Sequence, residues 1–196
     1  RDKLSWGGLA AAWGGGPTFA GVSVTPEGAL SLSAYYAAVE RISTDVGSLP
    51  LYLYRRVGKS RREVDGHPLA TLLGESPDGE TTPMRFRQAL MGHVLGWGNG
   101  YCEITFKDGY PSGVYLLAPG STTPRRRPQD NVLYYRHQDG TLPPKRVLHI
   151  AGFGFDGLVG YTKAHLAREC IGLAFAQERQ NARMYAGARP GGVLEI

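Results

Sequence analysis

The sequence predicts an α+β protein in which an antiparallel β meander packs with helices and one long C-terminal helix follows. Three observations support this class. Two segments carry apolar residues at helical spacing, four later runs alternate like strands, and residues 160–187 read as one helix. The helical and strand patterns occupy separate parts of the chain, which favours an α+β class over alternating strand–helix units.

The composition is that of a globular protein and excludes several classes. The chain has 196 residues, of which 42% are hydrophobic and 20% charged. Its two cysteines, Cys102 and Cys170, have neither a disulfide-framework nor a metal-ligand spacing, which is typical of a reduced, cytosolic product. No run of 18 apolar residues and no signal-peptide pattern occurs, so we expect no membrane span. The chain starts at Arg1, not Met, and stops inside an apolar run, so we expect a fragment of a longer protein.

The first part of the chain predicts an arm, a helix and a hairpin. Residues 1–24 are rich in Gly, Ala and Trp without periodicity and are interpreted as a flexible arm, whose tryptophans either dock on a neighbour or are stray aromatics. Residues 33–47 predict a helix that Pro50 ends. Its apolar stripe consists of Tyr35, Val39, Ile42, Val46 and Leu49. A strand at 51–54 and another at 61–64 flank a turn at 58–60.

The middle of the chain predicts two helices and then the strands. A short helix covers 67–73 and a loop covers 76–81. Thr82 and Pro83 are a good helix start, and a glycine-rich stretch at 98–100 ends that helix. Its stripe consists of Phe86, Leu90, Val94 and Trp97. The strand-like runs are 101–107, 113–117, 132–136 and 146–150, and residues 119–128 read as a long connection.

The long helix has a predicted start at Thr162 and a predicted left-handed end at Gly187. About 24 residues at 1.5 Å each give a length of roughly 36 Å. One face carries Leu166, Cys170, Leu173 and Met184, and a roughly opposite face carries Ile171, Phe175 and Ala182. Neither face is a dominant apolar stripe. The pattern fits close packing against helices of other subunits or an ordinary buried helix with a narrow core face, and periodicity alone does not separate these.

No pattern for catalysis, metal or cofactor binding is present. The chain lacks a phosphate-binding loop, a nucleophile elbow and a zinc-binding helix motif. Its five histidines are scattered, and His149 alternates with apolar residues as a strand residue would. Asp156 and Glu169 fall on a loop and a helix without a partner base, so we expect them to be structural. We therefore predict no catalytic, cofactor-binding or metal-binding residues, and no enzyme.

Basic residues are clustered in a chain whose formal net charge is +5. One run holds Arg55, Arg56, Lys59, Arg61 and Arg62, and the other is the triplet 125–127. Two solvated turns are the favoured interpretation. The alternative is a basic nucleic-acid-binding module that uses both runs, which would bind free DNA in a salt-dependent manner. An enzyme with an unrecognised site is a third hypothesis.

Four stretches carry a family resemblance. In chain order these are YYAAVERIS (35–43) with SLPLYLY (48–54), LGWGNGYCEI (95–104), RVLHIAGF (146–153) with DGLVG (156–160), and AGARPGGVL (186–194). Their sequences and their order resemble those of phage portal proteins. The resemblance covers residues 22–196. It implies a subunit of a ring, usually a dodecamer, at one capsid vertex of the virion, assembled in the host cytoplasm. Double-stranded DNA would pass through the central channel during packaging and ejection.

The resemblance also implies a division of the chain. Residues 1–24 would be the arm, 25–162 a wing domain, 163–188 the first stem helix, and 189–196 the first strand of an incomplete clip domain. Expected partners are copies of the chain, the DNA, the terminase packaging motor, the major capsid protein and head–tail adaptors. The candidate channel or inter-subunit residues are Arg168, Glu169, Gly172, Ala174, Ala176, Glu178, Arg179 and Arg183, and Arg189 is the candidate motor- or adaptor-facing residue.

Overall fold

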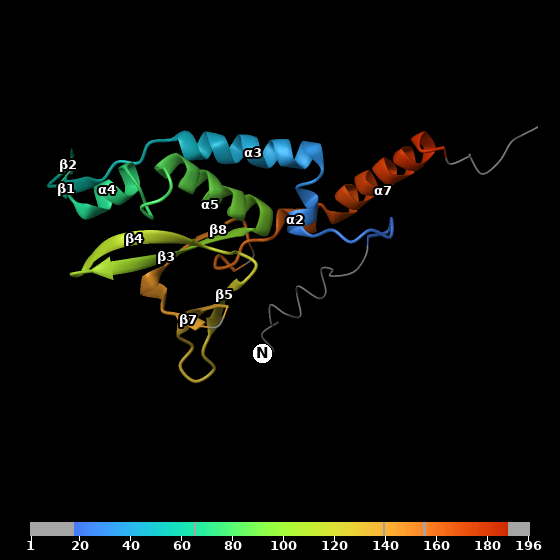
Figure 1. The fold of residues 1–196 in the computed structure, drawn as a ribbon. Helices are drawn as coiled ribbons and strands as arrows, with labels where there is room; N and C mark the ends of the chain where they lie inside the picture. The colour runs from blue at the N-terminus through green and yellow to red at the C-terminus, as the bar shows by residue number, and fades with distance from the viewer. Residues whose placement is uncertain (1–17, 65, 139, 155, 188–196) are drawn as a thin grey trace, which may run out of the picture. The chain divides into compact units, whose positions relative to one another are not determined.

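A computed structural model describes residues 18–64, 66–138, 140–154 and 156–187, which fall into two compact units (Figure 1). The sheet unit is Ala37–Thr162, and the terminal unit joins the residues up to Tyr36 with those from Lys163 onward. Helix α3 (Ser33–Ser48) runs from the terminal unit into the sheet unit. Helices accompany strands that all pair antiparallel, so the predicted α+β class is confirmed.

The first sheet of the sheet unit has three strands in the order β4-β3-β8. These strands are β3 (Asn99–Lys107), β4 (Tyr110–Leu117) and β8 (Val147–Ala151). Helices α4 (Pro68–Gly74) and α5 (Pro83–Trp97) lie over one face of this sheet (Figure 1). The core between them consists of Phe86, Leu90, Cys102 and Val114. Leu90 is 6% exposed, as the helical stripe predicted.

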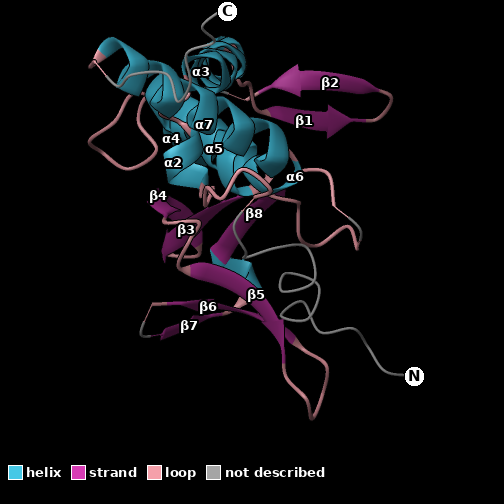
Figure 2. Cartoon of the chain, turned by 90° about the vertical axis from the view of Figure 1, so that its right-hand side faces the viewer, coloured by secondary structure: helices cyan, strands magenta, loops and turns pink. Residues whose placement is uncertain are grey.

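The second three-stranded sheet continues below the first one in Figure 2 and has the order β5-β6-β7. Its strands are β5 (Thr122–Arg126), β6 (Leu133–His137) and β7 (Gly140–Leu142), and the short helix η1 (Pro144–Arg146) leads into β8. The prediction of an irregular connection at 119–128 was therefore wrong. Pro124 and three arginines obscured a strand that lies at the sheet edge, where proline is tolerated.

The local signals at both ends of α5 are confirmed. The Thr82 hydroxyl accepts a hydrogen bond from the Arg85 N–H at 3.4 Å, and Pro83 is the first helical residue. Gly98 ends the helix with a φ of 80°. A Cβ at Gly98 would also collide with the carbonyl of Tyr161, so this position needs glycine for two reasons.

Helix α3 starts at the predicted residue and ends one residue later, and small residues make its close contact with α5. Ile42 and Leu49 of the predicted stripe are 44% and 60% exposed, while Ser43 and Gly47 are buried. A Cβ at Gly47 would lie 2.9 Å from the Met84 carbonyl oxygen, so α3 packs on α5 through its small residues. Of the predicted stripe, Tyr35 packs against the core of Ala29, Ala164 and Ile171, while Val46 and Leu49 line an apolar pocket of the sheet unit.

The hairpin forms around the expected turn, but its strands are shifted along the chain from the predicted ranges. Strand β1 (Tyr54–Val57) pairs with β2 (Ser60–Glu63), and Gly58 in the turn has a φ of 61°. The first strand begins at Tyr54, not at residue 51 as predicted. Every side chain of the two strands is exposed, and the two strands form a sheet of their own.

The terminal unit contains α2 (Pro26–Ala29), α6 (Lys163–Leu166) and α7 (Arg168–Tyr185). The prediction of one uninterrupted helix was wrong, because Ala167 at φ −96° and ψ 11° separates α6 from α7. The Thr162 hydroxyl donates to the Trp97 carbonyl at 3.2 Å instead of accepting from the helix. Gly187 has the predicted left-handed conformation, with a φ of 90°.

The last residues of the predicted arm, from Thr18 onward, pack against α7. Thr18 is buried and its hydroxyl donates to the Val22 carbonyl at 2.9 Å. The core of the terminal unit is built from Ala29, Ala164 and Ile171. Residues 1–17 and the predicted clip strand at 189–196 lie outside the described residues. The predicted division into arm, wing, stem and clip stays a prediction.

Candidate assembly surfaces

Helix α7 presents one buried and one exposed face. Ile171 is 4% exposed, and Phe175 packs against the same cluster. On the other face Leu173 and Met184 are 53% and 55% exposed, and Cys170 is exposed too. Every residue from 177 to 187 is exposed. Since a short helix is marginal alone in water, this exposed half calls for a partner.

The predicted stem residues divide into two sets. Glu169 forms an ion pair with Arg168 at 3.3 Å and accepts the backbone N–H of Phe19 at 2.9 Å. A Cβ at Gly172 would lie 2.6 Å from Thr18, so this glycine faces its own unit. These three predicted positions hold the terminal unit together.

The remaining predicted positions are more accessible. Ala174 and Ala176 are half-buried, whereas Glu178, Arg179 and Arg183 are exposed. The exposed positions carry both charge signs. Arg189 lies outside the described residues. Which of these residues face a channel or a neighbouring subunit stays a prediction.

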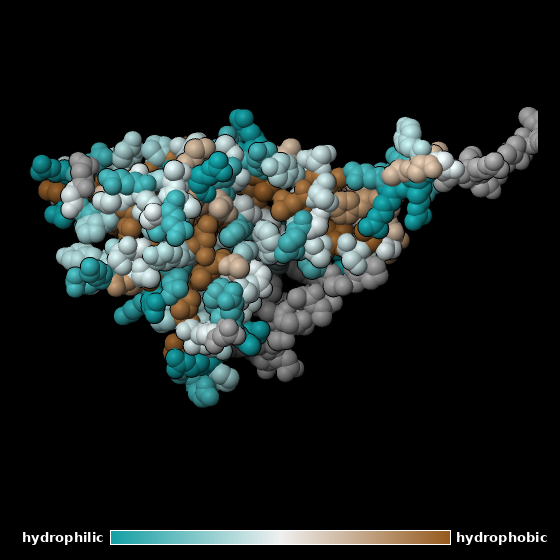
Figure 3. Space-filling view, in the orientation of Figure 1, coloured by the Kyte–Doolittle hydropathy of each residue, from teal (hydrophilic) through white to brown (hydrophobic). Residues whose placement is uncertain are grey.

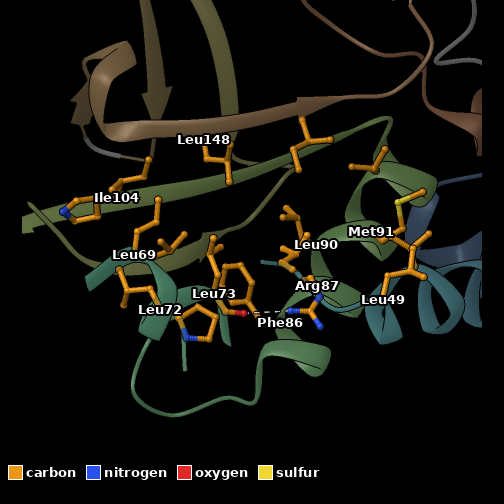
Figure 4. Close-up of a pocket in the computed structure, with 17 residues that line it drawn as sticks. Leu49, Leu69, Leu72, Leu73, Phe86, Arg87, Leu90, Met91, Ile104 and Leu148 are labelled. Carbon is orange, nitrogen blue, oxygen red and sulfur yellow. Dashed lines mark hydrogen bonds between the residues drawn. The ribbon is translucent and has the colours of Figure 1, made fainter. Parts of the chain in front are cut away.

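The sheet unit contains an apolar pocket of about 540 Å³ (Figure 4). Side chains from α4, α5 and the sheet line it, among them Leu69, Leu90 and Leu148. Its one charged lining residue is Arg87, which donates to the carbonyls of Gly47 at 3.1 Å and Leu73 at 3.4 Å. The described lining therefore offers no converging titratable groups of the kind a reaction site needs.

A buried polar network lies on the β3–β8 pair and holds the loop that precedes α6. Asn99, 7% exposed, accepts the Gly160 N–H at 2.8 Å through Oδ1 and donates to the Gly160 carbonyl at 3.0 Å through Nδ2. The same Oδ1 lies 3.1 Å from Nε2 of His149, whose Nδ1 is 3.3 Å from the Tyr135 hydroxyl. The His149 ring also stacks on Tyr101, with ring centroids 4.4 Å apart.

The charges and hydrogen bonds around this network fit a structural role. Burial lowers the pKa of His149, and nearby Asp156 opposes that effect only partly. Asp156 itself accepts the N–H groups of Leu158 at 2.9 Å and Val159 at 2.8 Å. Sequence reasoning identified His149 as a strand residue but missed Asn99. The signal available was a single asparagine between two glycines, and its partner Gly160 lies 61 residues away.

The remaining reactive groups of the described chain are shielded or isolated. Burial raises the pKa of the Cys102 thiol to about 12, which keeps it protonated and inert. Within the described ranges, no three His, Cys, Asp or Glu side chains are grouped to hold a metal ion. No described helix has the length and apolarity that crossing a membrane requires.

The comparisons identify the family. The family model described as "Phage portal protein" matches residues 33–196, and the chain belongs to this family. It is similar to the portal protein of Enterobacteria phage HK97, with 30% identity over 88% of this chain and 42% of the relative. The probable portal protein of Streptomyces phage phiC31 is also 30% identical, over 90% of this chain and 41% of the relative. The chain thus spans less than half the length of these relatives.

Solved structures agree on the fold. A portal protein of the HK97 family from Corynebacterium diphtheriae superposes with a TM-score of 0.58 at 17% identity, covering 92% of this chain and 57% of that one. A chain from the neck of an empty GTA particle, computed with C6 symmetry, has a TM-score of 0.59 at 19% identity, covering 85% and 52%. A chain from the neck of a native GTA particle, computed with C12 symmetry, has a TM-score of 0.56 at 18% identity, covering 95% and 55%.

Proposed function

We propose that this chain is part of a portal subunit whose copies form a ring at one vertex of a phage or prophage capsid. The ring would be the channel for DNA packaging and ejection, and the docking site for the packaging motor and the tail. Family membership and the symmetric neck assemblies among the structural neighbours support a ring subunit. A ring needs two different surfaces of each subunit to meet, because only head-to-tail contacts with a closing rotation produce one.

The observation that carries the proposal is the exposed half of α7. Residues 177–187, among them Met184, are all exposed, and Leu173 extends this surface toward the N-terminal half of the helix. Packing against neighbouring copies of α7 would bury these side chains and stabilise the helix end. The mixed charges of Glu178, Arg179 and Arg183 suit a bore through which DNA slides, because an all-basic lining would add affinity with every phosphate contact.

The proposal is tested by introducing a charge on the exposed face of α7. In the protein at its natural full length, Leu173→Arg should prevent ring assembly and leave thermal stability unchanged, because Leu173 is 53% exposed within the chain. Val132→Arg is the matched control, since Val132 is an apolar loop residue 46% exposed. Size-exclusion chromatography with light scattering distinguishes rings from monomers. Normal rings from Leu173→Arg, or equal losses in both variants, would contradict the proposed interface.

A second variant separates the interface from the core of the unit. Ala174 is half-buried, and Ala174→Trp should keep the monomer folded but prevent ring formation by forcing neighbouring helices apart. If Ala174 instead contributed to the core, overpacking would destabilise the monomer by roughly 1–3 kcal/mol. A shifted melting temperature of the monomer would therefore count against the interface.

A further inference from the structure

The two arginine-rich runs differ in how their charges are matched. At the end of β5, Arg126 donates to the Asn131 carbonyl at 3.0 Å, and Arg127, just after the strand, pairs with Asp130 at 3.5 Å. In the β1–β2 hairpin, Arg56 Nε donates to the Gly58 carbonyl at 3.4 Å. Among the described residues no carboxylate forms an ion pair with the hairpin arginines. The positive charge of the hairpin is therefore largely unbalanced.

The strand register concentrates this charge further. Arg55 lies directly opposite Arg62, and Arg56 lies directly opposite Arg61. Like charges directly opposite each other destabilise a strand pair, and a lone two-stranded ribbon is at best marginally stable. The hairpin also carries Lys59 in its turn against a single acidic residue, Glu63. Binding of a polyanion would reduce the repulsion between these arginines.

The two arginine pairs project from opposite faces of the ribbon. Directly opposed residues share a face, and successive residues alternate between faces. One face thus carries the pair Arg55 and Arg62, and the other carries Arg56 and Arg61. All these residues are exposed, and Figure 3 shows hydrophilic side chains in teal beside apolar ones in brown on the side where Figure 1 places β1 and β2.

We propose that the β1–β2 ribbon binds the phosphate backbone of double-stranded DNA by inserting into a groove, without reading sequence. The major groove admits a two-stranded ribbon, and phosphates border it on both sides. A ribbon with an arginine pair on each face can reach both borders at once. A flat acidic protein surface would engage one face only. This site is on the sheet unit, apart from α7, and the inference does not depend on ring formation.

The test measures binding of the chain to a short duplex of random sequence by fluorescence anisotropy at several salt concentrations. Four phosphate contacts predict a slope of about −3.6 for log K against log salt, which is about a 150-fold loss between 50 and 200 mM. Three charge-matched double variants are compared: Arg55→Gln with Arg62→Gln, Arg56→Gln with Arg61→Gln, and, as the control, Arg125→Gln with Arg126→Gln. Circular dichroism verifies that each variant is folded.

Each ribbon variant should make the slope shallower by about 1.8 and weaken binding at 0.1 M salt about 60-fold, while the control changes it little. Equal losses in all three variants would show diffuse charge attraction and overturn the proposal. A loss confined to one ribbon face would overturn groove insertion. Competition by poly-glutamate as strong as by DNA at equal charge would assign the ribbon to an acidic protein partner instead. A wild-type chain that does not bind the duplex would overturn the proposal.

Discussion

Replacing Asn99 by alanine should detach the loop that precedes α6 from the sheet. The side chain makes four interactions: with the N–H and carbonyl of Gly160 at 2.8 and 3.0 Å, with His149 Nε2 at 3.1 Å, and with the Trp97 carbonyl at 3.4 Å. Each net hydrogen bond contributes about 1 kcal/mol, and the buried groups of Gly160 would lose their partner, so we expect a loss of about 2–4 kcal/mol. That is a large part of the 5–15 kcal/mol typical of a domain.

Two measurements test this expectation. Urea unfolding followed by circular dichroism gives the change in free energy, with Thr162→Val as a graded comparison because Thr162 makes one hydrogen bond, to Trp97, and should cost about 0.5–1.5 kcal/mol. Hydrogen exchange at the Gly160 amide reports the loop directly and should accelerate in Asn99→Ala. An unchanged unfolding free energy together with a still-protected Gly160 amide would refute the role assigned to Asn99.

Three further outcomes are expected. Leu90→Ala should lower the free energy of unfolding by about 2–3 kcal/mol, near the low end for a buried leucine, because the space opens into an existing pocket. Leu49→Ala, at an exposed position, should lower it by under about 0.5 kcal/mol. Urea unfolding compares the two variants, and equal effects would mean that α5 does not contribute to the core. Burial lowers the pKa of His93 and His149 below 6.5, so the unfolded chain binds protons more readily than the folded chain. The free energy of unfolding should therefore be highest above pH 6.5 and decline as the pH falls through the lowered pKa values. Unfolding measurements over this pH range that show no decline would contradict the expectation. The purified chain should not hydrolyse ATP, and turnover that a point substitution in this chain abolishes would overturn that expectation.

Local chemistry made some elements predictable. Thr82, Pro83 and Gly98 act within a few residues of themselves, so the start and end of α5 followed from the sequence. The break at Ala167 has no such signal, because alanine favours the helix on both sides. The sequence therefore predicted one helix where the structure has two, α6 and α7.

Long-range packing made other features unpredictable. Periodicity identified the apolar stripe of α3 but not the close approach of α5 at Gly47, because a residue without a side chain leaves no hydrophobic pattern. The hydrogen bond between the Gly160 N–H and Asn99 joins residues 61 positions apart, so no local sequence pattern indicates it. Likewise, the opposition of Arg55 with Arg62 became visible only from the strand register, since the sequence shows merely a basic run around a turn.

The central claim is that the chain is part of a ring-forming portal subunit. Native mass spectrometry of the protein at its natural full length tests this most directly, because it counts the copies in one assembly. The account predicts a single large closed species, with twelve copies expected from the family resemblance. A protein that stays monomeric or forms only dimers at the concentrations at which it folds would contradict the claim.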